Sequence, residues 1–237
     1  MWPFRLKSSL ESSGAFRGFT DWHSHILPGV DDGIPDMEQS LKVLERYEQL
    51  GIREVWLTPH VMEDIPNATT ALRQHFNGLS SAYTGPLKLH LAAEYMLDNG
   101  FEERLNSDDL LCIGSPDSKT LLVETSYFNP PMDLYGAIAH IQERGYQLLL
   151  AHPERYIYMD SGDYERLQAC GVKFQCNITS LTEAYGKDAY RKFSTLLAKG
   201  WIRALGTDIH RLSSFNRAIE RKSLSYKQRT LLLNNIR

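Results

Sequence analysis

The segment Asp-Trp-His23-Ser-His25-Ile-Leu-Pro-Gly-Val-Asp-Asp-Gly33 places two histidines one residue apart, at the end of a run with strand character. Near the far end of the chain, Gly-Thr-Asp208-Ile-His210 pairs an aspartate with a histidine at the same spacing. Residues i and i+2 of an extended strand point to the same side, so each pair can aim two side chains into one pocket. Imidazole and carboxylate groups are common metal ligands. The two pairs together therefore predict a metalloenzyme.

The chain has the size of one large α/β domain. Its 237 residues fit a single unit, and we expect residues 18–237 to form it, preceded by a lead-in of residues 1–17. The net charge of -3 and the pI of about 6.2 provide no basic face for neutralising phosphates. A nucleic-acid partner is therefore not favoured.

Cysteine usage and the first residues indicate a reducing compartment. Cys112, Cys170 and Cys176 are an odd number without paired zinc-binding spacing, which argues against a secreted disulfide framework. The lead-in carries an early proline and a glutamate, and it has no apolar run long enough for a signal peptide or a membrane span. We expect a cytoplasmic protein without membrane insertion.

Short apolar or β-branched runs alternate with helical periodicity along the chain. The runs are Phe19–His23, Glu54–Thr58, Lys88–Ala92, Thr120–Glu124, Gln147–Ala151, Val172–Asn177 and Ile202–Gly206. The clearest helices are predicted over Asp36–Leu50, Asp133–Arg144 and Lys187–Lys199, each followed by a glycine that can end it. This alternation is typical of βαβ units with a parallel sheet.

Polar side chains stand at or just past the end of every predicted strand. In strand order they are His23 with His25, His60, Glu94, Glu124, His152, Asn177, and Asp208 with His210. A closed parallel barrel gathers these ends around one mouth, whereas an open sheet brings together only those at its switch point. We therefore predict an α/β fold with a barrel of fewer than eight strands and a site at its mouth.

The predicted mouth holds enough ligands for more than one metal ion. Five histidines with several carboxylates indicate two or three divalent ions. Such ions generate hydroxide near neutral pH and stabilise charged oxygens, so hydrolysis is the expected reaction. The other three histidines, His75, His90 and His140, fall away from the strand ends and are expected to be structural or exposed.

Arg155 follows His152 by three residues and is within reach of the same mouth. A guanidinium fork suits a phosphoryl group, so Arg155 is the candidate catalytic contact and the substrate is predicted to be a phosphate ester. An ion pair with Glu154 is the alternative. A rim for a flat leaving group is predicted from Tyr95, Met96, Tyr127, Phe128, Pro130 and Pro131, with ordinary barrel packing as the alternative.

Six motifs of the chain resemble the polymerase and histidinol phosphatase (PHP) superfamily. They are Asp-Trp-His23-Ser-His-Ile-Leu-Pro-Gly-Val-Asp-Asp-Gly, Leu-Thr-Pro-His60, Ala-Ala-Glu94-Tyr-Met-Leu, Leu-Leu-Val-Glu124-Thr-Ser, Leu-Ala-His152-Pro-Glu-Arg-Tyr and Gly-Thr-Asp208-Ile-His210. From about Gly18 to His210, the chain most resembles the metal-dependent protein tyrosine phosphatases of bacterial capsular and extracellular polysaccharide synthesis. The resemblance implies a distorted (β/α)7 barrel of the PHP type with a trinuclear metal site.

Carried over residue by residue, the resemblance also implies the ligand set. The first metal would take His23, His25, Glu94 and Asp208; the second Glu94, Glu124 and His152; the third Asp32, His60 and His210. Asp31 would instead shape the turn before Gly33. Manganese is the implied metal, with iron and zinc as alternatives. By the same analogy, a metal-bridging hydroxide attacks phosphorus while Arg155 stabilises the developing charge.

The resemblance further implies a partner and leaves one contact open. The substrate would be a phosphotyrosyl protein, namely a membrane-associated bacterial tyrosine kinase with a tyrosine-rich tail that controls polysaccharide synthesis and export. Members of the family often carry a second phosphate-binding arginine shortly after the last histidine. Here Arg211 and Arg217 both stand in that region, and the sequence does not choose between them.

Two other functions fit the same residues. A PHP phosphoesterase for a small molecule, such as histidinol phosphate or a nucleotide, would share the metals and differ at the rim. A non-catalytic phosphotyrosine-binding module would keep the barrel without turnover. A cysteine-dependent phosphatase is excluded, because the position six residues after each cysteine holds Ser118, Cys176 or Thr182 instead of arginine. No Gly-x-x-x-x-Gly-Lys-Ser/Thr loop supports a P-loop enzyme.

Overall fold

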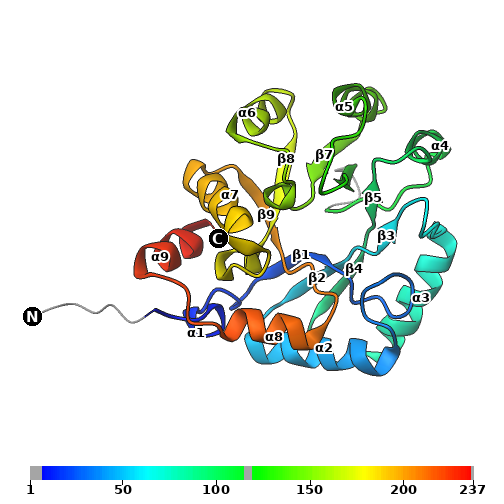
Figure 1. Cartoon of the computed structure of the whole chain (residues 1–237). Coiled ribbons are helices and arrows are strands. Elements are labelled where there is room, and N and C mark those ends of the chain that lie inside the picture. The colour runs from blue at the N-terminus through cyan, green and yellow to red at the C-terminus, as the bar shows by residue number, and fades with distance from the viewer. Residues whose placement is uncertain (1–6, 115–118, 236–237) are drawn as a thin grey trace, which may run out of the picture.

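A computed structural model describes residues 7–114 and 119–235 and shows an α/β fold whose strand pairs are parallel (Figure 1). One sheet has the order β1-β2-β4 and the other the order β3-β5-β6-β7-β8-β9. The strands are β1 (Thr20–Ser24), β2 (Glu54–Leu57), β3 (His60–Val61), β4 (Lys88–Leu91), β5 (Glu94–Met96), β6 (Thr120–Glu124), β7 (Gln147–Leu150), β8 (Lys173–Asn177) and β9 (Ile202–Gly206). All seven predicted strand positions are confirmed.

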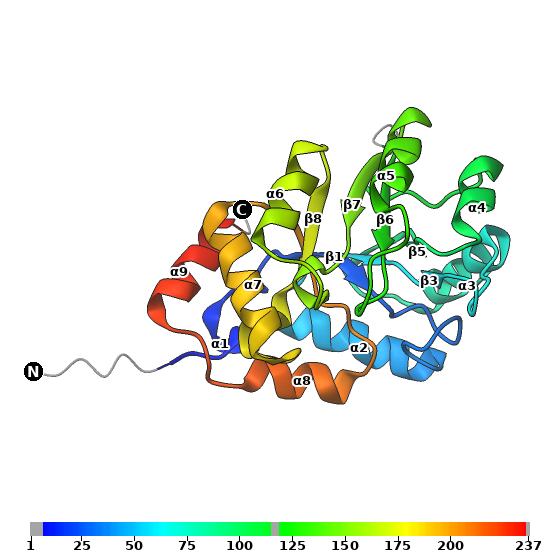
Figure 2. The same cartoon turned by 45° about the horizontal axis from the view of Figure 1, so that its top comes forward.

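Helices surround these strands (Figure 2). They are α1 (Leu10–Ser13), α2 (Met37–Leu50), α3 (Thr69–Ala82), α4 (Phe101–Ser107), α5 (Leu134–Glu143), α6 (Ser161–Ala169), α7 (Gly186–Lys199), α8 (Leu212–Glu220) and α9 (Tyr226–Asn235), with 3-10 turns η1 (Pro153–Arg155) and η2 (Ile178–Thr182). Helix α2 shows why the predicted boundaries hold: the Asp36 side chain accepts a hydrogen bond from the Gln39 amide (2.8 Å), and Gly51 ends the helix in the left-handed conformation.

Strands β3 and β5 were not predicted from the sequence. Each continues an earlier strand after a two-residue bend, Thr58-Pro59 before β3 and Ala92-Ala93 before β5. The bends transfer the chain from the smaller sheet to the larger one, where His60 pairs with Glu94 in parallel register. The bends therefore bring the predicted site residues His60 and Glu94 side by side.

The ends of β1 and β9 meet without a strand ladder among the described residues. Instead, the amide of Asp208 donates to the carbonyl of His23 (2.8 Å), and the amide of His25 donates to the carbonyl of Ile209 (3.2 Å). Gly206 permits this approach, because a Cβ atom at its position would lie 2.5 Å from the Cβ of His23. The expected barrel is thus distorted, and loop hydrogen bonds join its two edges.

Asp21 reinforces this junction from within the core. Its carboxylate is fully buried and accepts hydrogen bonds from the Thr207 amide (2.8 Å), the Thr207 hydroxyl (2.7 Å) and the Tyr47 hydroxyl (2.7 Å). Strand β1, the segment after β9 and helix α2 are therefore tied through one side chain.

Removal of the Asp21 carboxylate tests that role. Asp21→Ala is expected to lower the free energy of unfolding by about 2–3 kcal/mol, because it leaves buried donors without an acceptor. Urea denaturation measures the change. Asp64→Ala, at an exposed aspartate, is the control; equal stabilities of the two variants would show that Asp21 does not hold the junction.

The N-terminal residues that are described pack onto this framework. Leu10, Ala15 and Phe16 are buried, and the ring of Phe16 contacts those of Phe19 and Phe215. Residues 1–6 of the predicted lead-in lie outside the described residues. Within the described part of the chain, no helix combines the length and apolar character needed to cross a bilayer.

Candidate metal centre

Nine side chains singled out in the sequence converge at the C-terminal ends of the strands. They are His23, His25, Asp32, His60, Glu94, Glu124, His152, Asp208 and His210, and they form overlapping groups with ligand atoms within 4.8 Å of one another. Seven of them are buried; His210 is partly buried, and the Asp32 side chain is 67 % exposed. The cluster is therefore open to solvent on the side of Asp32 and His210.

Glu94 occupies the middle of the cluster. Its Oε2 lies 3.1 Å from His23 Nε2, 3.1 Å from His60 Nδ1 and 3.4 Å from His25 Nε2. Its Oε1 lies 3.0 Å from His152 Nε2. One carboxylate thus faces four imidazoles, an arrangement suited to bridging two cations.

The remaining groups flank Glu94 on either side. Glu124 Oε1 lies 2.9 Å from His60 Nδ1, whereas its Oε2 lies 3.9 Å from His152 Nε2. Asp32 Oδ1 lies 3.3 Å from His210 Nε2 and 3.6 Å from His60 Nε2. His60 therefore sits between the ligand groups that the resemblance implied for the second and the third metal.

Several buried atoms of the cluster form no well-aligned hydrogen bond with any described residue, although some of them face a carboxylate or imidazole at 2.9–3.1 Å. They are both carboxylate oxygens of Glu94, Glu124 Oε1, Asp208 Oδ1, His60 Nδ1 and both ring nitrogens of His152. Burying polar atoms without hydrogen bonds is costly, and a cation between them would satisfy them. Imidazole nitrogens together with carboxylate oxygens form a donor set that suits divalent transition metals. The residues therefore fit a multinuclear metal site.

The metal-free cluster shifts the pKa values of its histidines in opposite directions. Burial alone would lower the pKa of His23, but the carboxylates of Glu94 and Asp208 raise it to about 9. For His60, Glu94 and Glu124 likewise outweigh burial and raise the pKa to about 10. Burial lowers the pKa of His152 to about 4. Metal ligation requires neutral imidazoles, so binding at His23 and His60 would have to release protons.

Three polar residues that the sequence did not identify as contacts of the ligands hold the candidate ligands in place. Asp31 Oδ2 lies 2.8 Å from His25 Nδ1, and Gln175 Oε1 lies 2.8 Å from His23 Nδ1. Asn177 Nδ2 donates to Asp208 Oδ2 (2.7 Å). Such contacts fix the orientation of a ligand ring or carboxylate. Gln175 and Asn177 lie near the end of a predicted strand and Asp31 was expected to shape the turn before Gly33, but neither position revealed these contacts.

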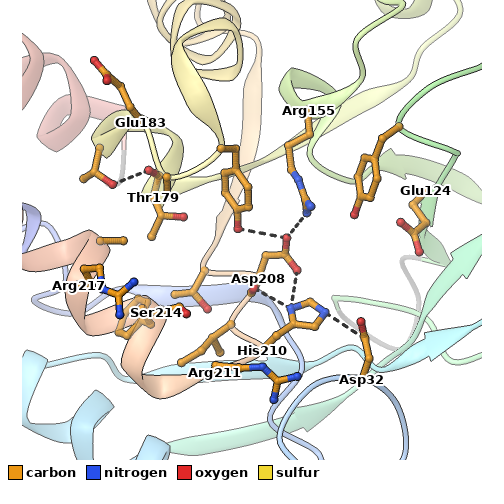
Figure 3. Close-up of a pocket in the computed structure, with 18 of the residues that line it drawn as sticks. Asp32, Glu124, Arg155, Thr179, Glu183, Asp208, His210, Arg211, Ser214 and Arg217 are labelled. Carbon is orange, nitrogen blue, oxygen red and sulfur yellow. Dashed lines mark hydrogen bonds and ion pairs between the residues drawn. The ribbon is translucent and has the colours of Figure 1, made fainter.

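Arg155 is held by Asp208 and not by Glu154. Its Nη1 lies 2.5 Å from Asp208 Oδ2 (Figure 3). Its guanidinium is sandwiched between the rings of Tyr127 (4.3 Å to the centroid) and Tyr185 (4.4 Å). The neighbouring Glu154 points into the core, where it accepts hydrogen bonds from the Asn177 amide and the Ser180 hydroxyl. Arg155 thus reaches the mouth of the barrel, as predicted.

A cavity of about 920 Å³ lies over the cluster and is lined by Glu124, Arg155 and Asp208 among others. Arg211 and Arg217 both lie on its wall (Figure 3). Among the described residues, neither guanidinium has a hydrogen-bond or ion-pair partner. The structure therefore keeps both arginines as candidates for a second anion contact.

The predicted aromatic rim is present only in part. Met96 and Tyr127 line the cavity. Tyr95 is buried instead, and its hydroxyl accepts a hydrogen bond from the Leu111 amide. Pro130 and Pro131 line a separate hollow of about 360 Å³. Proximity in sequence to a strand end was not enough to place these side chains: Tyr95 lies within β5 and packs into the core, and the loop after β6 places Tyr127 at the cavity but Pro130 and Pro131 at the separate hollow.

Comparison with known proteins finds relatives over most of the chain. The model of the family described as "Capsular polysaccharide synthesis, CpsB/CapC" matches residues 19–230. The tyrosine-protein phosphatase YwqE of Bacillus subtilis (strain 168) is 27% identical over 202 residues, which cover 83% of this chain and 79% of the relative. A putative tyrosine-protein phosphatase CapC of Staphylococcus aureus is 23% identical over 201 residues, covering 82% and 78% of the two chains.

A solved structure shares the fold and more distantly the sequence. It comes from the work on YwqE from Bacillus subtilis and CpsB from Streptococcus pneumoniae, described as unique metal-dependent tyrosine phosphatases. The TM-score is 0.74 and the identity 25%, over 91% of this chain and 94% of that chain. The agreement extends over nearly the whole fold that positions the cluster.

Proposed function

The chain belongs to the CpsB/CapC family of capsular polysaccharide synthesis, and from this membership we propose that it is a metal-dependent phosphatase that hydrolyses phosphotyrosine on proteins. The observation that carries the proposal is the convergence of nine candidate ligands next to Arg155 at the floor of an open cavity. A phosphate monoester needs both features, namely a charged centre that activates water and a donor for the phosphoryl oxygens.

We propose three overlapping metal sites. His23, His25, Glu94 and Asp208 would form the first; Glu94, Glu124 and His152 the second, with His60 close to it; Asp32, His60 and His210 the third. Divalent ions there, manganese in our proposal with iron and zinc as alternatives, would supply a nucleophile at neutral pH and stabilise charge on the phosphoryl group.

Arg155 would bind and orient the phosphoryl group. A guanidinium has five N–H donors, and one nitrogen of Arg155 is engaged by Asp208. The rings of Tyr127 and Tyr185 fix the orientation of the guanidinium plane. The N–H groups of Arg155 that Asp208 does not engage are therefore oriented before the substrate binds. A tyrosine leaving group has an intrinsic pKa of about 10 and needs less help from a general acid than an alkyl alcohol does.

The physiological partner in this proposal is a phosphotyrosyl protein, a membrane-associated bacterial tyrosine kinase with a tyrosine-rich tail. The relatives' names support phosphotyrosine as the substrate. A cytoplasmic location fits the three cysteines, which are all free thiols. Arg211 and Arg217 would be available to contact the phosphate or nearby acidic groups of such a partner.

Metal removal tests the proposal directly. The purified protein is expected to contain two to three divalent ions per chain by elemental analysis. Chelation should abolish phosphate release from a phosphotyrosyl peptide, because it removes the ions that would activate water and stabilise charge on the phosphoryl group. Adding manganese should restore the activity.

Parallel rates separate the two alternatives. Histidinol phosphate and a dinucleotide are assayed beside the phosphotyrosyl peptide at the same enzyme and metal concentrations. A strong preference for either small molecule would show that the substrate is a small phosphate ester and not a phosphotyrosyl protein. Saturating metal without turnover of any ester would make the chain a phosphotyrosine-binding module.

A further inference from the structure

Tyr127 is fixed beside Arg155 by both its ring and its backbone. The guanidinium of Arg155 lies over the ring, 4.3 Å from its centroid. The Tyr127 carbonyl accepts a hydrogen bond from the Ile157 amide (2.9 Å), which joins the loop after β6 to the segment after η1. The centroid of the His152 ring lies 5.6 Å from that of the Tyr127 ring. The side chain is therefore held at a defined place in the mouth of the barrel.

The hydroxyl of Tyr127 differs from those of the buried tyrosines. Tyr47, Tyr95, Tyr146, Tyr156 and Tyr164 are the buried ones, and each hydroxyl has a hydrogen-bond partner. Tyr185, on the opposite face of Arg155, places its hydroxyl 3.4 Å from Asp208 Oδ2. Within residues 7–114 and 119–235, no protein group forms a hydrogen bond with the Tyr127 hydroxyl.

This hydroxyl is available to a ligand. Tyr127 is half-buried and lines the cavity together with Arg155, Glu124 and Asp208. Near neutral pH a phenol carries its proton and can donate one hydrogen bond. Because the guanidinium of Arg155 lies over the Tyr127 ring and lines the same cavity, an anion bound by that guanidinium would also lie near the phenol.

We propose that the Tyr127 hydroxyl donates a hydrogen bond to a non-bridging oxygen of the phosphoryl group that Arg155 binds. The inference rests on the proposed phosphatase function and adds a second protein donor to it. No proton is transferred, since the phenol keeps its hydrogen throughout. The contact stabilises the charge that the non-bridging oxygens carry during transfer of the phosphoryl group.

Tyr127→Phe removes the hydroxyl and keeps the ring against Arg155. The variant is expected to lose about ten- to hundredfold in kcat/KM on a phosphotyrosyl peptide, the usual range for a hydrogen bond to a charged group. The loss should be the same with p-nitrophenyl phosphate, because a non-bridging contact does not depend on the leaving group. Inorganic phosphate should also bind more weakly by calorimetry, with metal content unchanged.

Tyr158→Phe is the matched control, because the Tyr158 hydroxyl is hydrogen-bonded to Thr125 and its ring stacks on Tyr156 outside the cavity lining. It should keep wild-type kinetics. A Tyr127→Phe enzyme as active as the wild type would overturn the inference, as would a loss confined to the poorer leaving group, which would place the contact at the bridging oxygen. Failure of the wild-type protein to hydrolyse any ester would instead overturn the proposed function.

Discussion

Glu94→Gln is expected to lower kcat/KM by about a thousandfold or more, equivalent to about 4 kcal/mol of transition-state stabilisation. The two oxygens of Glu94 face His23, His25, His60 and His152 at 3.0–3.4 Å. An amide has the same shape, but it loses the charge and presents an NH2 group to the imidazoles. We therefore expect metal content, measured by elemental analysis, to fall together with activity.

Glu102→Gln is the matched control for this substitution. Glu102 lies on α4 and pairs with His140 on α5, away from the cluster. Its variant should keep both metal and activity, and His140→Ala should do the same. Full metal content and near-wild-type turnover in Glu94→Gln would contradict the bridging role, because the central carboxylate charge would then be dispensable.

Arg155→Ala is expected to reduce kcat/KM by about 10²- to 10³-fold while the metals remain bound, a range typical of losing one preorganised donor to a charged oxygen. Asp208 should keep its position, because Asn177 Nδ2 still donates to its Oδ2 at 2.7 Å. Arg155→Lys should recover little, since an ammonium group lacks the planar fork and the stacking on two rings.

Arg166→Ala controls for the loss of a positive charge. Arg166 is an exposed residue of α6 that pairs with Asp163. Its variant should hydrolyse a phosphotyrosyl peptide at the wild-type rate. If Arg155→Ala lost its metals, the residue would act on Asp208 and not on the phosphoryl group, and the phosphate-binding role would be wrong.

The strands and eight of the nine candidate ligands could be predicted because each signal is local, whereas Asp32 lies in a loop and was singled out by the family resemblance. An apolar run followed at once by a histidine or carboxylate, as in Leu-Leu-Val-Glu124, marks a buried strand and the polar group at its end. Strands β3 and β5 could not be predicted, because they are only two and three residues long. Their pairing depends on the bends at Thr58-Pro59 and Ala92-Ala93, which move the chain from one sheet to the other. Such a change of sheet is defined only in the complete fold.

The residues that support the ligands could not be identified from the sequence for a different reason. Gln175 contacts His23 across 152 positions of the chain, and Asn177 contacts Asp208 across 31. A polar residue near a strand end can face a ligand, a loop or solvent. Which of these it faces depends on how the strands close into the barrel. Proximity in sequence suggested Glu154 as the alternative partner of Arg155, but the Glu154 carboxylate accepts hydrogen bonds from Asn177 and Ser180 instead.

The spread of the ligands along the chain has a consequence for biosynthesis. His23 and His25 emerge from the ribosome early, whereas Asp208 and His210 come last, and the hydrogen bonds that join β1 to Asp208 and Ile209 need both ends. A nascent chain that ends before residue 210 lacks part of the candidate donor set. The complete set can therefore assemble only after nearly nine-tenths of the 237 residues have been synthesised.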